Sequence, residues 1–455
     1  MGNTDLDRRR FLATGGAAAA GAVLGSTSQR SYASRRRSSN KIRLALVGTG
    51  IRGTSMWGRD VVRNYSDVAE FVGLSDINPG RLEYGREYIG ADCPTYVDFD
   101  QMMREQEPDM LIVTTMDSTH HEFIIKGLEA GADVVTEKPM TTDDVKCRAI
   151  LDAERRSGKK VIVTFNYRYS PNRARMKEML MNGRIGEVTS VDFHWYLDIY
   201  HGASYFRRWH GQREYGGTLL VHKATHHFDL MNWWLDSEPE TVYAQGALEH
   251  YGTNNPFRST NCRGCPHQDR CDFYMDITQN QRLMDLYVAH EEHDGYLRDG
   301  CLWREDINIY DKMGVQARYA NGVQLTYSLT TYSPYEGYRI AFNGTEGRLE
   351  AWIKERQPWE AEDYDEIRVT DNFGETELIR ISHAGGGHGG GDVRLMDRVF
   401  REPDAPDPLQ QSAGSRDGAM SILLGIAARK SIETGQPVNV ASLTDLQPRA
   451  VRPRG

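Results

Sequence analysis

Lys138 is the residue whose type and position best suit proton transfer. It lies in the run VVTEKPM, directly after an apolar segment and before Pro139. Proline biases the preceding residue toward extended backbone, so we expect Lys138 at a strand end, the edge where α/β sheets bind ligands. An amine there can hydrogen-bond a substrate hydroxyl and ease its deprotonation, provided that burial or neighbouring groups lower the pKa of the lysine. The alternative is an ordinary surface lysine.

A glycine-rich turn earlier in the chain could hold a dinucleotide. The apolar run IRLALVG leads into GTGIRG, which places Gly48, Gly50 and Gly53 at the G-x-G-x-x-G spacing. These glycines would permit a tight turn, approach of a pyrophosphate and close helix packing, respectively. Asp76 ends the next apolar run, and its carboxylate would bind a ribose 2′-hydroxyl and repel a 2′-phosphate. NAD is therefore favoured over NADP, although Arg81 nearby weakens that preference. A turn without a ligand is the alternative.

The elements that must position these residues follow from the apolar pattern. Between residues 41 and 165, short Val- and Ile-rich runs alternate with helix-length segments, which is typical of βαβ units around a parallel sheet. From residue 166 onward, longer stretches alternate apolar and polar residues, which predicts a largely antiparallel sheet with one wetted face. We therefore expect an α/β protein with a nucleotide-binding domain at 41–165 and a substrate-binding domain at 166–455.

Four segments carry a family resemblance. TTMDSTHHEFIIKGLEAGADVVTEKPM, NYRYSPNRARMKEMLMNGRIGEVTSV, HHFDLMNWWL and SILLGIAARKSIETGQPV resemble, in order and spacing, the Gfo/Idh/MocA oxidoreductases. The resemblance implies an N-terminal Rossmann domain and a C-terminal α/β domain whose large open sheet forms the floor of a sugar or cyclitol pocket. It also implies a homo-oligomer joined through that sheet. The candidate cofactor-binding residues are Gly48, Gly50, Ile51, Arg52, Gly53, Asp76, Arg81, Thr115, His120, Glu137 and Lys138.

A histidine cluster departs from the pattern of that family. The family has Asp, three residues, His, two residues and Asp; His226 and Asp229 match the latter part, so His226 is the candidate general acid/base. His222 replaces the first Asp, and Lys223 follows it. At positions i and i+4, His222 and His226 would share one helix face. We expect both residues and Lys223 to act with Lys138, either by lowering the pKa of His226 or by forming a site for an acidic sugar. A purely structural role for the additional histidines is the alternative.

The segment AGGGHGGGD (384–392) cannot be regular structure, because glycine costs about 1 kcal/mol per residue in a helix interior relative to alanine. It is either a flexible linker or a loop that approaches a ligand, with Asp392 capping the helix behind it. It resembles the GGHGG-Asp element of some exported members of the family, including NAD-dependent glycosidases. The candidate substrate-binding residues are Tyr167, Arg168, Trp209, His227, His388 and Asp392.

Four of the six cysteines cluster in sequence. Cys262, Cys265 and Cys271 lie close together, and Cys301 follows. Four thiolates at this spacing suit a structural, tetrahedral Zn²⁺ that would staple a long loop, because no coordination position stays open for catalysis. Disulfides are the alternative in an exported protein, and an iron–sulfur cluster is a more distant one. Some members of the family carry a similar cluster as an insertion, which would occupy residues 250–305 of this chain.

The N-terminal stretch DRRRFLATGGAAAAGAVLG resembles a twin-arginine export signal. We expect a signal peptide at 1–33, a linker at 34–40, and a periplasmic or extracellular protein without stable membrane insertion after cleavage. A membrane anchor is the alternative, but the apolar run is shorter than the roughly 18 residues that a span needs. The formal net charge of −9 argues against nucleic acid as a partner.

A dinucleotide site would explain why this chain is exported in the folded state. Because the dinucleotide is made in the cytoplasm, a protein that uses it outside must load it before export and keep it. We therefore predict an NAD(P)-dependent oxidoreductase that acts on a hydroxyl of a sugar, sugar derivative or cyclitol with a tightly bound, recycled cofactor. The alternatives are a redox-neutral, NAD-dependent glycoside hydrolase or lyase that works through a 3-keto intermediate, and a non-catalytic carbohydrate-binding protein.

Overall fold

The computed structural model describes residues 40–451, so the predicted signal peptide lies outside the described residues. Residues from Lys41 onward form one compact unit. Its N-terminal part contains a six-stranded sheet in the order β3-β2-β1-β4-β5-β6, and all its neighbouring strands are parallel. The strands are β1 (Ile42–Val47), β2 (Ala69–Ser75), β3 (Thr95–Tyr96), β4 (Met110–Val113), β5 (Asp133–Thr136) and β6 (Val161–Val163).

This strand order is that of a doubly wound Rossmann sheet, in which the chain reverses direction across the sheet between β1 and β4. Ligands bind at that reversal, outside the carboxyl ends of the strands. The helices of this part are α1 (Ile51–Thr54), α2 (Val61–Tyr65), α3 (Pro79–Ile89), α4 (Phe99–Gln106), α5 (His120–Glu129) and α6 (Asp144–Ser157). A π-helical segment, Ser55–Asp60, joins α1 to α2.

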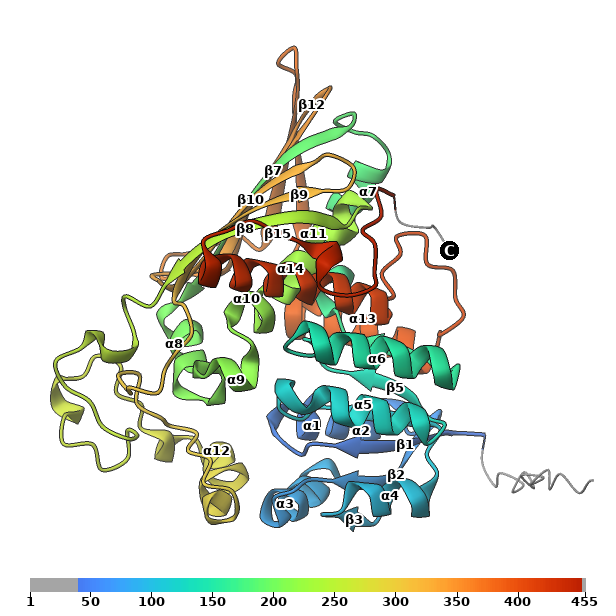
Figure 1. The fold of residues 1–455 in the computed structure, drawn as a ribbon, viewed down its shortest axis with the longest axis vertical. Coiled ribbons are helices and arrows are strands. Elements are labelled where there is room, and N and C mark those ends of the chain that lie inside the picture. The colour runs from blue at the N-terminus through green and yellow to red at the C-terminus, as the bar shows by residue number, and fades with distance from the viewer. Residues whose placement is uncertain (1–39, 452–455) are drawn as a thin grey trace, which may run out of the picture. The chain divides into compact units, whose positions relative to one another are not determined.

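The C-terminal part is built on a nine-stranded sheet in the order β14-β13-β12-β11-β7-β10-β9-β8-β15 (Figure 1). Only β7 and β10 pair in parallel; the remaining neighbours are antiparallel. The strands are β7 (Val188–Asp198), β8 (Pro239–Ala247), β9 (Lys312–Tyr319), β10 (Gln324–Ser333), β11 (Glu336–Gly344), β12 (Gly347–Arg356), β13 (Tyr364–Asp371), β14 (Thr376–Ser382) and β15 (Val438–Asn439). Buried and exposed residues alternate strictly along β9, as a sheet with one wetted face requires. The predicted α/β fold with a parallel and a mostly antiparallel sheet is confirmed.

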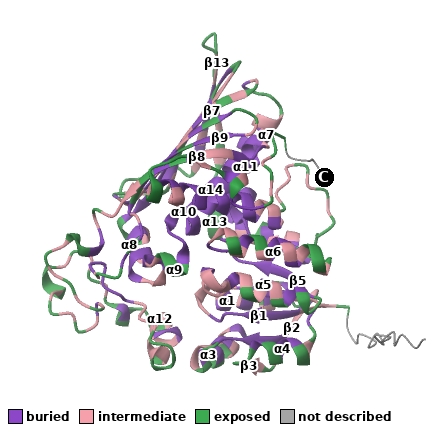
Figure 2. Cartoon of the chain, in the orientation of Figure 1, coloured by how far each residue is buried: buried purple, intermediate pink, exposed green. Residues whose placement is uncertain are grey.

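Two helices separate the nine-stranded sheet from the Rossmann part. Every residue of α11 (Ala224–Leu235) is buried, and so is most of α14 (Ser415–Thr434) (Figure 2). The other helices are α7 (Pro171–Met181), α8 (Ile199–Arg207), α9 (Arg213–Gly216), α10 (Leu219–His222), α12 (Gln281–Leu286) and α13 (Gly387–Phe400). Within the described residues, no helix is both long enough and apolar enough to cross a membrane.

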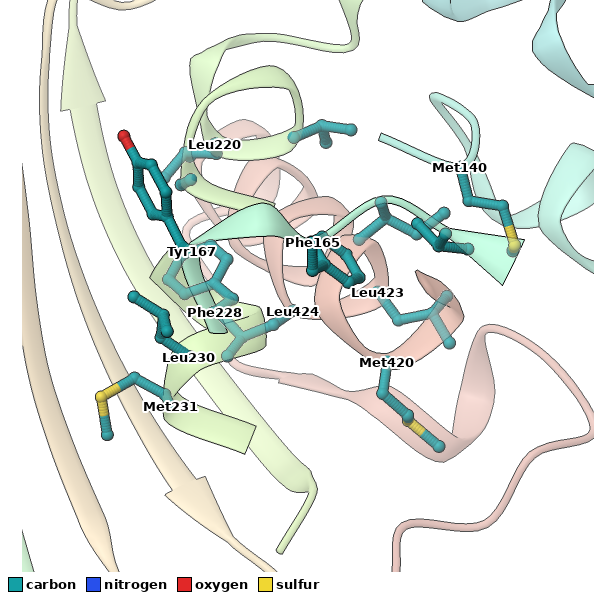
Figure 3. Close-up of a cluster of buried hydrophobic side chains, with 14 of the residues drawn as sticks. Met140, Phe165, Tyr167, Leu220, Phe228, Leu230, Met231, Met420, Leu423 and Leu424 are labelled. Atoms are coloured by element: carbon teal, nitrogen blue, oxygen red, sulfur yellow. The ribbon is translucent and has the colours of Figure 1, made fainter. Parts of the chain in front are cut away.

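One hydrophobic core joins the two parts. Figure 3 shows Phe165, which follows β6, packed among side chains of α11 and α14 such as Phe228 and Leu424. Backbone pairing also crosses this boundary, because Ile162 of β6 forms an antiparallel bridge with Gly414. Residues at the strand ends of the Rossmann sheet and residues of α10 and α11 are therefore held in fixed relative positions.

Candidate active site

The glycine turn forms a backbone cradle that side chains would fill. Gly48 has a φ of +94°, and a Cβ there would lie 2.8 Å from the carbonyl carbon of Thr114. A Cβ on Gly53 would lie 2.1 Å from the oxygen of Gly48, so the helix packs directly against the turn. Gly50 is less enclosed, since its Cβ would meet only the Tyr287 hydroxyl, at 3.4 Å. The cradle therefore fits the backbone approach that a dinucleotide requires.

Asp76 lies beside this cradle at the end of β2. Its Oδ2 accepts hydrogen bonds from the backbone N–H and the hydroxyl of Thr49, at 2.7 and 3.0 Å. Arg81 lies 3.5 Å from the other carboxylate oxygen and also pairs with Asp294 at 2.5 Å. Asp76, the residue predicted to bind the ribose, is thus adjacent to the turn. The guanidinium of Arg81 is shared between Asp76 and Asp294.

Arg52 and Glu137 form an ion pair next to the turn. The Arg52 Nε donates to Glu137 Oε1 at 2.6 Å, and Trp57 Nε1 donates to the same oxygen at 2.7 Å. Burial opposes ionisation of Glu137, but the charges of Arg52 and Lys138 and these hydrogen bonds lower its pKa overall. Glu137 therefore stays ionised, and its contacts with Arg52 and Trp57 hold the backbone directly before Lys138 in place.

His120 anchors the other side of Lys138. Its ring nitrogens lie 2.8 Å from the Pro139 oxygen and 3.1 Å from the Thr115 oxygen. Burial lowers the pKa of His120, so its fully buried ring is neutral, and its single N–H can donate to one of these two carbonyls at the ends of β4 and β5. His120 and Thr115 thus support the strand ends at which the nucleotide is expected.

Lys138 has the environment of a base that works near neutral pH. The residue is partly buried, and its Nζ lies 3.4 Å from the backbone oxygen of His222. Burial lowers the pKa of Lys138 to about 8, while Asp117 and Glu137 oppose a larger decrease. A lysine with this pKa carries an appreciable fraction of free amine at neutral pH, as abstraction of a hydroxyl proton requires.

His222 has a carboxylate partner that sequence reasoning missed. Its Nδ1 lies 2.5 Å from Oδ2 of Asp117, and both residues are buried. Burial lowers the pKa of His222, and the nearby positive charge of Lys138 lowers it further. Burial likewise raises the pKa of Asp117, against the attraction of Lys138. The carboxylate absent at position 222 is thus supplied by the Rossmann part, from the turn after β4, where the run TTMDSTHH was the only signal in the sequence.

His222 and His226 lie on two consecutive helices instead of one, although the backbone of the intervening Lys223 stays in the helical region. His222 ends α10, and His226 lies in the first turn of α11. The His226 ring stacks on Tyr167, with centroids 4.3 Å apart. Burial and the charges of Lys138 and Lys223 lower the pKa of His226 well below its ordinary value, so the ring is neutral. Within residues 40–451, no hydrogen-bond partner reaches its buried Nδ1.

Lys138, Lys223, His226, Tyr167 and His388 line one cavity of about 590 Å³, a size typical of small-molecule sites. Lys223 Nζ donates to the Tyr167 hydroxyl at 3.1 Å. Because its lining is rich in charged and hydrogen-bonding side chains, the cavity suits a ligand that carries several hydroxyl groups.

The same cavity carries a hydrogen-bonded chain that sequence reasoning also missed. Glu336 Oε1 lies 2.6 Å from Nδ1 of His201, and Nε2 of His201 lies 2.9 Å from the Tyr205 hydroxyl. All three residues line the cavity. His201 and Tyr205 are one helical turn apart on α8, but Glu336 comes from β11, so no local pattern in the sequence brings all three together. The chain provides a second set of groups that can exchange a proton.

The C-terminal end of the glycine-rich segment packs closely, whereas residues 385–389 are exposed. A Cβ on Gly391 would lie 2.3 Å from the oxygen of Asn166. His388 has a φ of 53°, and its ring lies 5.5 Å from that of Tyr167 at the cavity. Residues 388–390 have a non-helical backbone, so the regular part of α13 begins after Gly390 and Asp392 lies in its first turn, not before it. The carboxylate instead accepts from Asn166 Nδ2 at 2.6 Å and lies 3.0 Å from His388 Nδ1.

Four predicted substrate residues, Asp392 among them, lie outside the residues that line the cavity. Arg168 is fully buried and pairs with Asp229 at 2.5 Å and with Asp417 at 2.9 Å. His227 is also fully buried, with Nδ1 2.7 Å from the Tyr327 hydroxyl. Trp209 stacks on the neighbouring His210. Their contacts are those of residues that support the cavity wall.

The four clustered cysteines surround one small pocket as free thiols. Arg207 donates a hydrogen bond to Cys262 Sγ at 3.2 Å. Its guanidinium would repel a metal ion bound to the same sulfur. Burial raises the pKa of Cys262, so this sulfur is held as a thiol. In the described part of the chain, no three His, Cys, Asp or Glu side chains are placed to hold a metal ion. The structure therefore does not support the predicted zinc site.

Comparisons with known proteins agree with this arrangement. Residues 42–165 match the NAD-binding Rossmann fold of the oxidoreductase family, and residues 177–440 match its C-terminal alpha/beta domain. The chain is 37% identical over 424 residues to YteT of Bacillus subtilis (strain 168), which is named as an oxidoreductase, and the match covers 89% of this chain and 99% of YteT. An inositol 2-dehydrogenase/D-chiro-inositol 3-dehydrogenase of Lactiplantibacillus plantarum is 22% identical over 197 residues, 43% of this chain and 53% of that protein.

Among solved structures, levoglucosan dehydrogenase in complex with NADH and levoglucosan has the same fold. The TM-score is 0.64 at 18% identity, and the match covers 88% of this chain and 99% of the other. The two matched domains and the nearly full-length similarity to YteT show that this chain belongs to the Gfo/Idh/MocA family of oxidoreductases.

Proposed function

We propose that the protein oxidises a secondary hydroxyl of a sugar, sugar derivative or cyclitol and uses an NAD that stays bound between turnovers. The observation that carries this proposal is Lys138, a lysine of lowered pKa at the edge of a nucleotide-binding sheet and in the wall of a polar cavity. Related proteins named inositol 2-dehydrogenase and levoglucosan dehydrogenase support this substrate class.

Different residues abstract the hydroxyl proton, orient the hydroxyl and position the base. The free amine of Lys138 takes the proton of the substrate hydroxyl, and a bound nicotinamide would supply the hydride acceptor. Neutral His226, stacked on Tyr167, orients the same hydroxyl through its ring nitrogen. The His222–Asp117 pair holds the backbone oxygen of His222 against the lysine amine, which fixes the position of Lys138.

Retention of the cofactor is part of the proposal. The N-terminal sequence resembles a twin-arginine signal, and we infer that the folded protein carries its dinucleotide to the periplasm or beyond. No external pool would replace a lost nucleotide, so the reduced form has to be reoxidised on the protein by a second carbonyl substrate. Native mass spectrometry of the purified protein should find one NAD per chain. A protein that is active yet contains no nucleotide and takes none up contradicts the proposal.

A second candidate is redox-neutral cleavage of a glycoside, and the Glu336–His201–Tyr205 chain favours it. Oxidation at C3 would acidify the C2–H bond, and a second base would remove that proton as the aglycone leaves. Water would then add, and the hydride would return to C3, so no net oxidation occurs. Release of nitrophenol from a nitrophenyl glycoside, with solvent deuterium at C2, would establish cleavage.

A substrate panel separates these functions from simple binding. Thermal shifts with monosaccharides, uronic acids and inositols would identify the ligand class of the NAD-loaded protein. The Lys138→Ala variant should retain the thermal shift and lose turnover. If wild type and variant bind equally and neither turns over any member of the panel, the protein is a carbohydrate-binding protein.

We also propose that copies of the chain associate through the nine-stranded sheet. Trp352 of β12 and Trp359 are 37% and 42% exposed, which is unusual for side chains of this size. Light scattering after size exclusion would give the oligomeric state, and a monomer at working concentrations contradicts this assignment.

A further inference from the structure

Residues 281–296, which we call the insertion arm, belong to the cysteine-rich insertion but lie against the Rossmann part. The arm contains α12 and the 3-10 segment Val288–His293. Figure 1 shows α12 beside α3, and Arg282 donates to the Ser55 hydroxyl at 3.1 Å, across 227 residues of sequence. The arm therefore packs on the part of the chain that contains the glycine turn.

Tyr287 of the arm reaches the glycine turn itself. Its hydroxyl accepts a hydrogen bond from the backbone N–H of Ile51 at 2.9 Å, and the residue is 8% exposed. In G-x-G-x-x-G turns, this stretch of backbone lies against the pyrophosphate. The Tyr287 hydroxyl thus lies at the edge of the pyrophosphate position, and its own proton is free to be donated to an oxygen there.

The first turn of α3 docks closely against the arm. Asn78 Nδ2 donates to the backbone oxygen of His290 at 2.9 Å. A Cβ on Gly80 would lie 2.2 Å from Nδ1 of His290, so even alanine would force the histidine ring to move. The close approach of α3 to the arm therefore depends on a glycine at position 80 beside the His290 ring.

Asp294 brings a second carboxylate to the ribose side of the site. Its Oδ2 lies 2.5 Å from the Arg81 nitrogen that also faces Asp76. Burial opposes ionisation of Asp294, but the hydrogen bond and charge of Arg81 lower its pKa overall. A 2′-phosphate would therefore meet two carboxylates and an arginine that is already paired.

We propose that the insertion arm closes the outer side of the nucleotide site, where Tyr287 retains the dinucleotide and Asp294 selects NAD over NADP. This inference rests on the proposed function, because it assigns residues to the same cofactor. Tyr287 donates to the pyrophosphate, and Asp294 keeps Arg81 from binding a 2′-phosphate. A dinucleotide enclosed in this way leaves only after the arm moves.

The Tyr287→Phe variant tests retention and keeps the aromatic ring in place. NAD-loaded, full-length protein is incubated with an NAD-hydrolysing enzyme that consumes whatever is released, and mass spectrometry follows the NAD still bound. Release should be about tenfold faster than in wild type, which corresponds to one hydrogen bond to a charged group. Tyr274→Phe is the matched control, because Tyr274 lies in the same insertion beside the cysteine pocket. Its release rate should equal that of wild type.

The Asp294→Asn variant tests selectivity independently of release. NAD-loaded protein is held in excess NADP until exchange is complete, and native mass spectrometry counts each bound nucleotide. The bound ratio of NADP to NAD should rise about tenfold over wild type, as expected for loss of one close charge pair. Asp269→Asn, at an exposed position of the insertion, should leave the ratio unchanged.

The possible results distinguish failure of the role proposed for the arm from failure of the proposed function. If wild type retains NAD and Tyr287→Phe retains it equally well, the arm does not hold the cofactor. If the variant retains NAD longer, Tyr287 competes with the pyrophosphate, which also overturns the inference. An unchanged nucleotide ratio in Asp294→Asn refutes the selectivity role. A wild-type protein that neither contains nor takes up NAD refutes the proposed function together with the arm.

Discussion

Replacement of Lys138 by arginine preserves a positive charge at the strand end and removes the ability to give up a proton near neutral pH. With a pKa of about 8, roughly one lysine in ten carries a free amine at pH 7. At the ordinary value of 10.5, only about one in 3,000 would do so. Burial therefore increases the population of the active base about 300-fold, and this gain is what the arginine variant loses.

The assay is a single turnover, in which absorbance at 340 nm reports reduction of the bound nicotinamide by the best substrate of the panel. The rate should rise about tenfold per pH unit up to roughly pH 8 and then level off, because only the deprotonated amine accepts the hydroxyl proton. Lys138→Arg should lower the plateau by about 10²- to 10⁴-fold, the usual contribution of a general base. Asp117→Asn should move the midpoint below pH 8, since Asp117 raises the pKa of Lys138.

Lys126→Ala is the matched control, because this exposed lysine pairs with Asp100 away from the cavity. It should reproduce the wild-type profile. A flat pH profile in wild type, or a Lys138→Arg variant with wild-type rates, would refute the assignment of Lys138 as the base. A midpoint that moves upward in Asp117→Asn would refute the electrostatic account of its pKa.

Three further substitutions test other parts of the structure. Gly53→Ala should abolish NAD retention and lower the melting temperature, because its Cβ would lie 2.1 Å from the Gly48 oxygen; mass spectrometry and differential scanning fluorimetry measure the two effects. Arg168→Ala should cost about 3–5 kcal/mol of unfolding free energy in urea titrations, since it breaks a buried ion-pair network; a loss below 1 kcal/mol contradicts a supporting role. Tyr205→Phe should reduce nitrophenol release about tenfold or more and leave single-turnover oxidation within twofold; equal losses in both would remove the argument for cleavage.

Local patterns were sufficient to predict the parallel sheet and the glycine turn. The turn needs glycines at fixed spacing after a strand, and each of these requirements is contained within a few neighbouring residues. The alternation that predicted the second sheet is local in the same sense. Lys138 could likewise be placed at a strand end from its apolar run and the following proline, and the structure holds it there beside the cavity.

Contacts between distant segments could not be predicted in the same way. Asp117 and His222 are 105 residues apart and meet only because the Rossmann part and α10 share one core. Arg168 carries a guanidinium that suits a ligand, yet Asp229 and Asp417 pair with it in the interior. The cysteine spacing suits zinc in isolation, but no single-sequence pattern shows that Arg207 lies against one of the sulfurs.

The bridge between Ile162 and Gly414 has a consequence for biosynthesis. The edge strand of the Rossmann sheet is completed by residues that leave the ribosome some 250 positions later, and Val163 donates to the oxygen of Ala413 at the same place. A nascent chain that ends before this point lacks these two backbone contacts at the edge of its first sheet. We expect nucleotide loading to be post-translational, with chains truncated before Ala413 unable to capture NAD during synthesis.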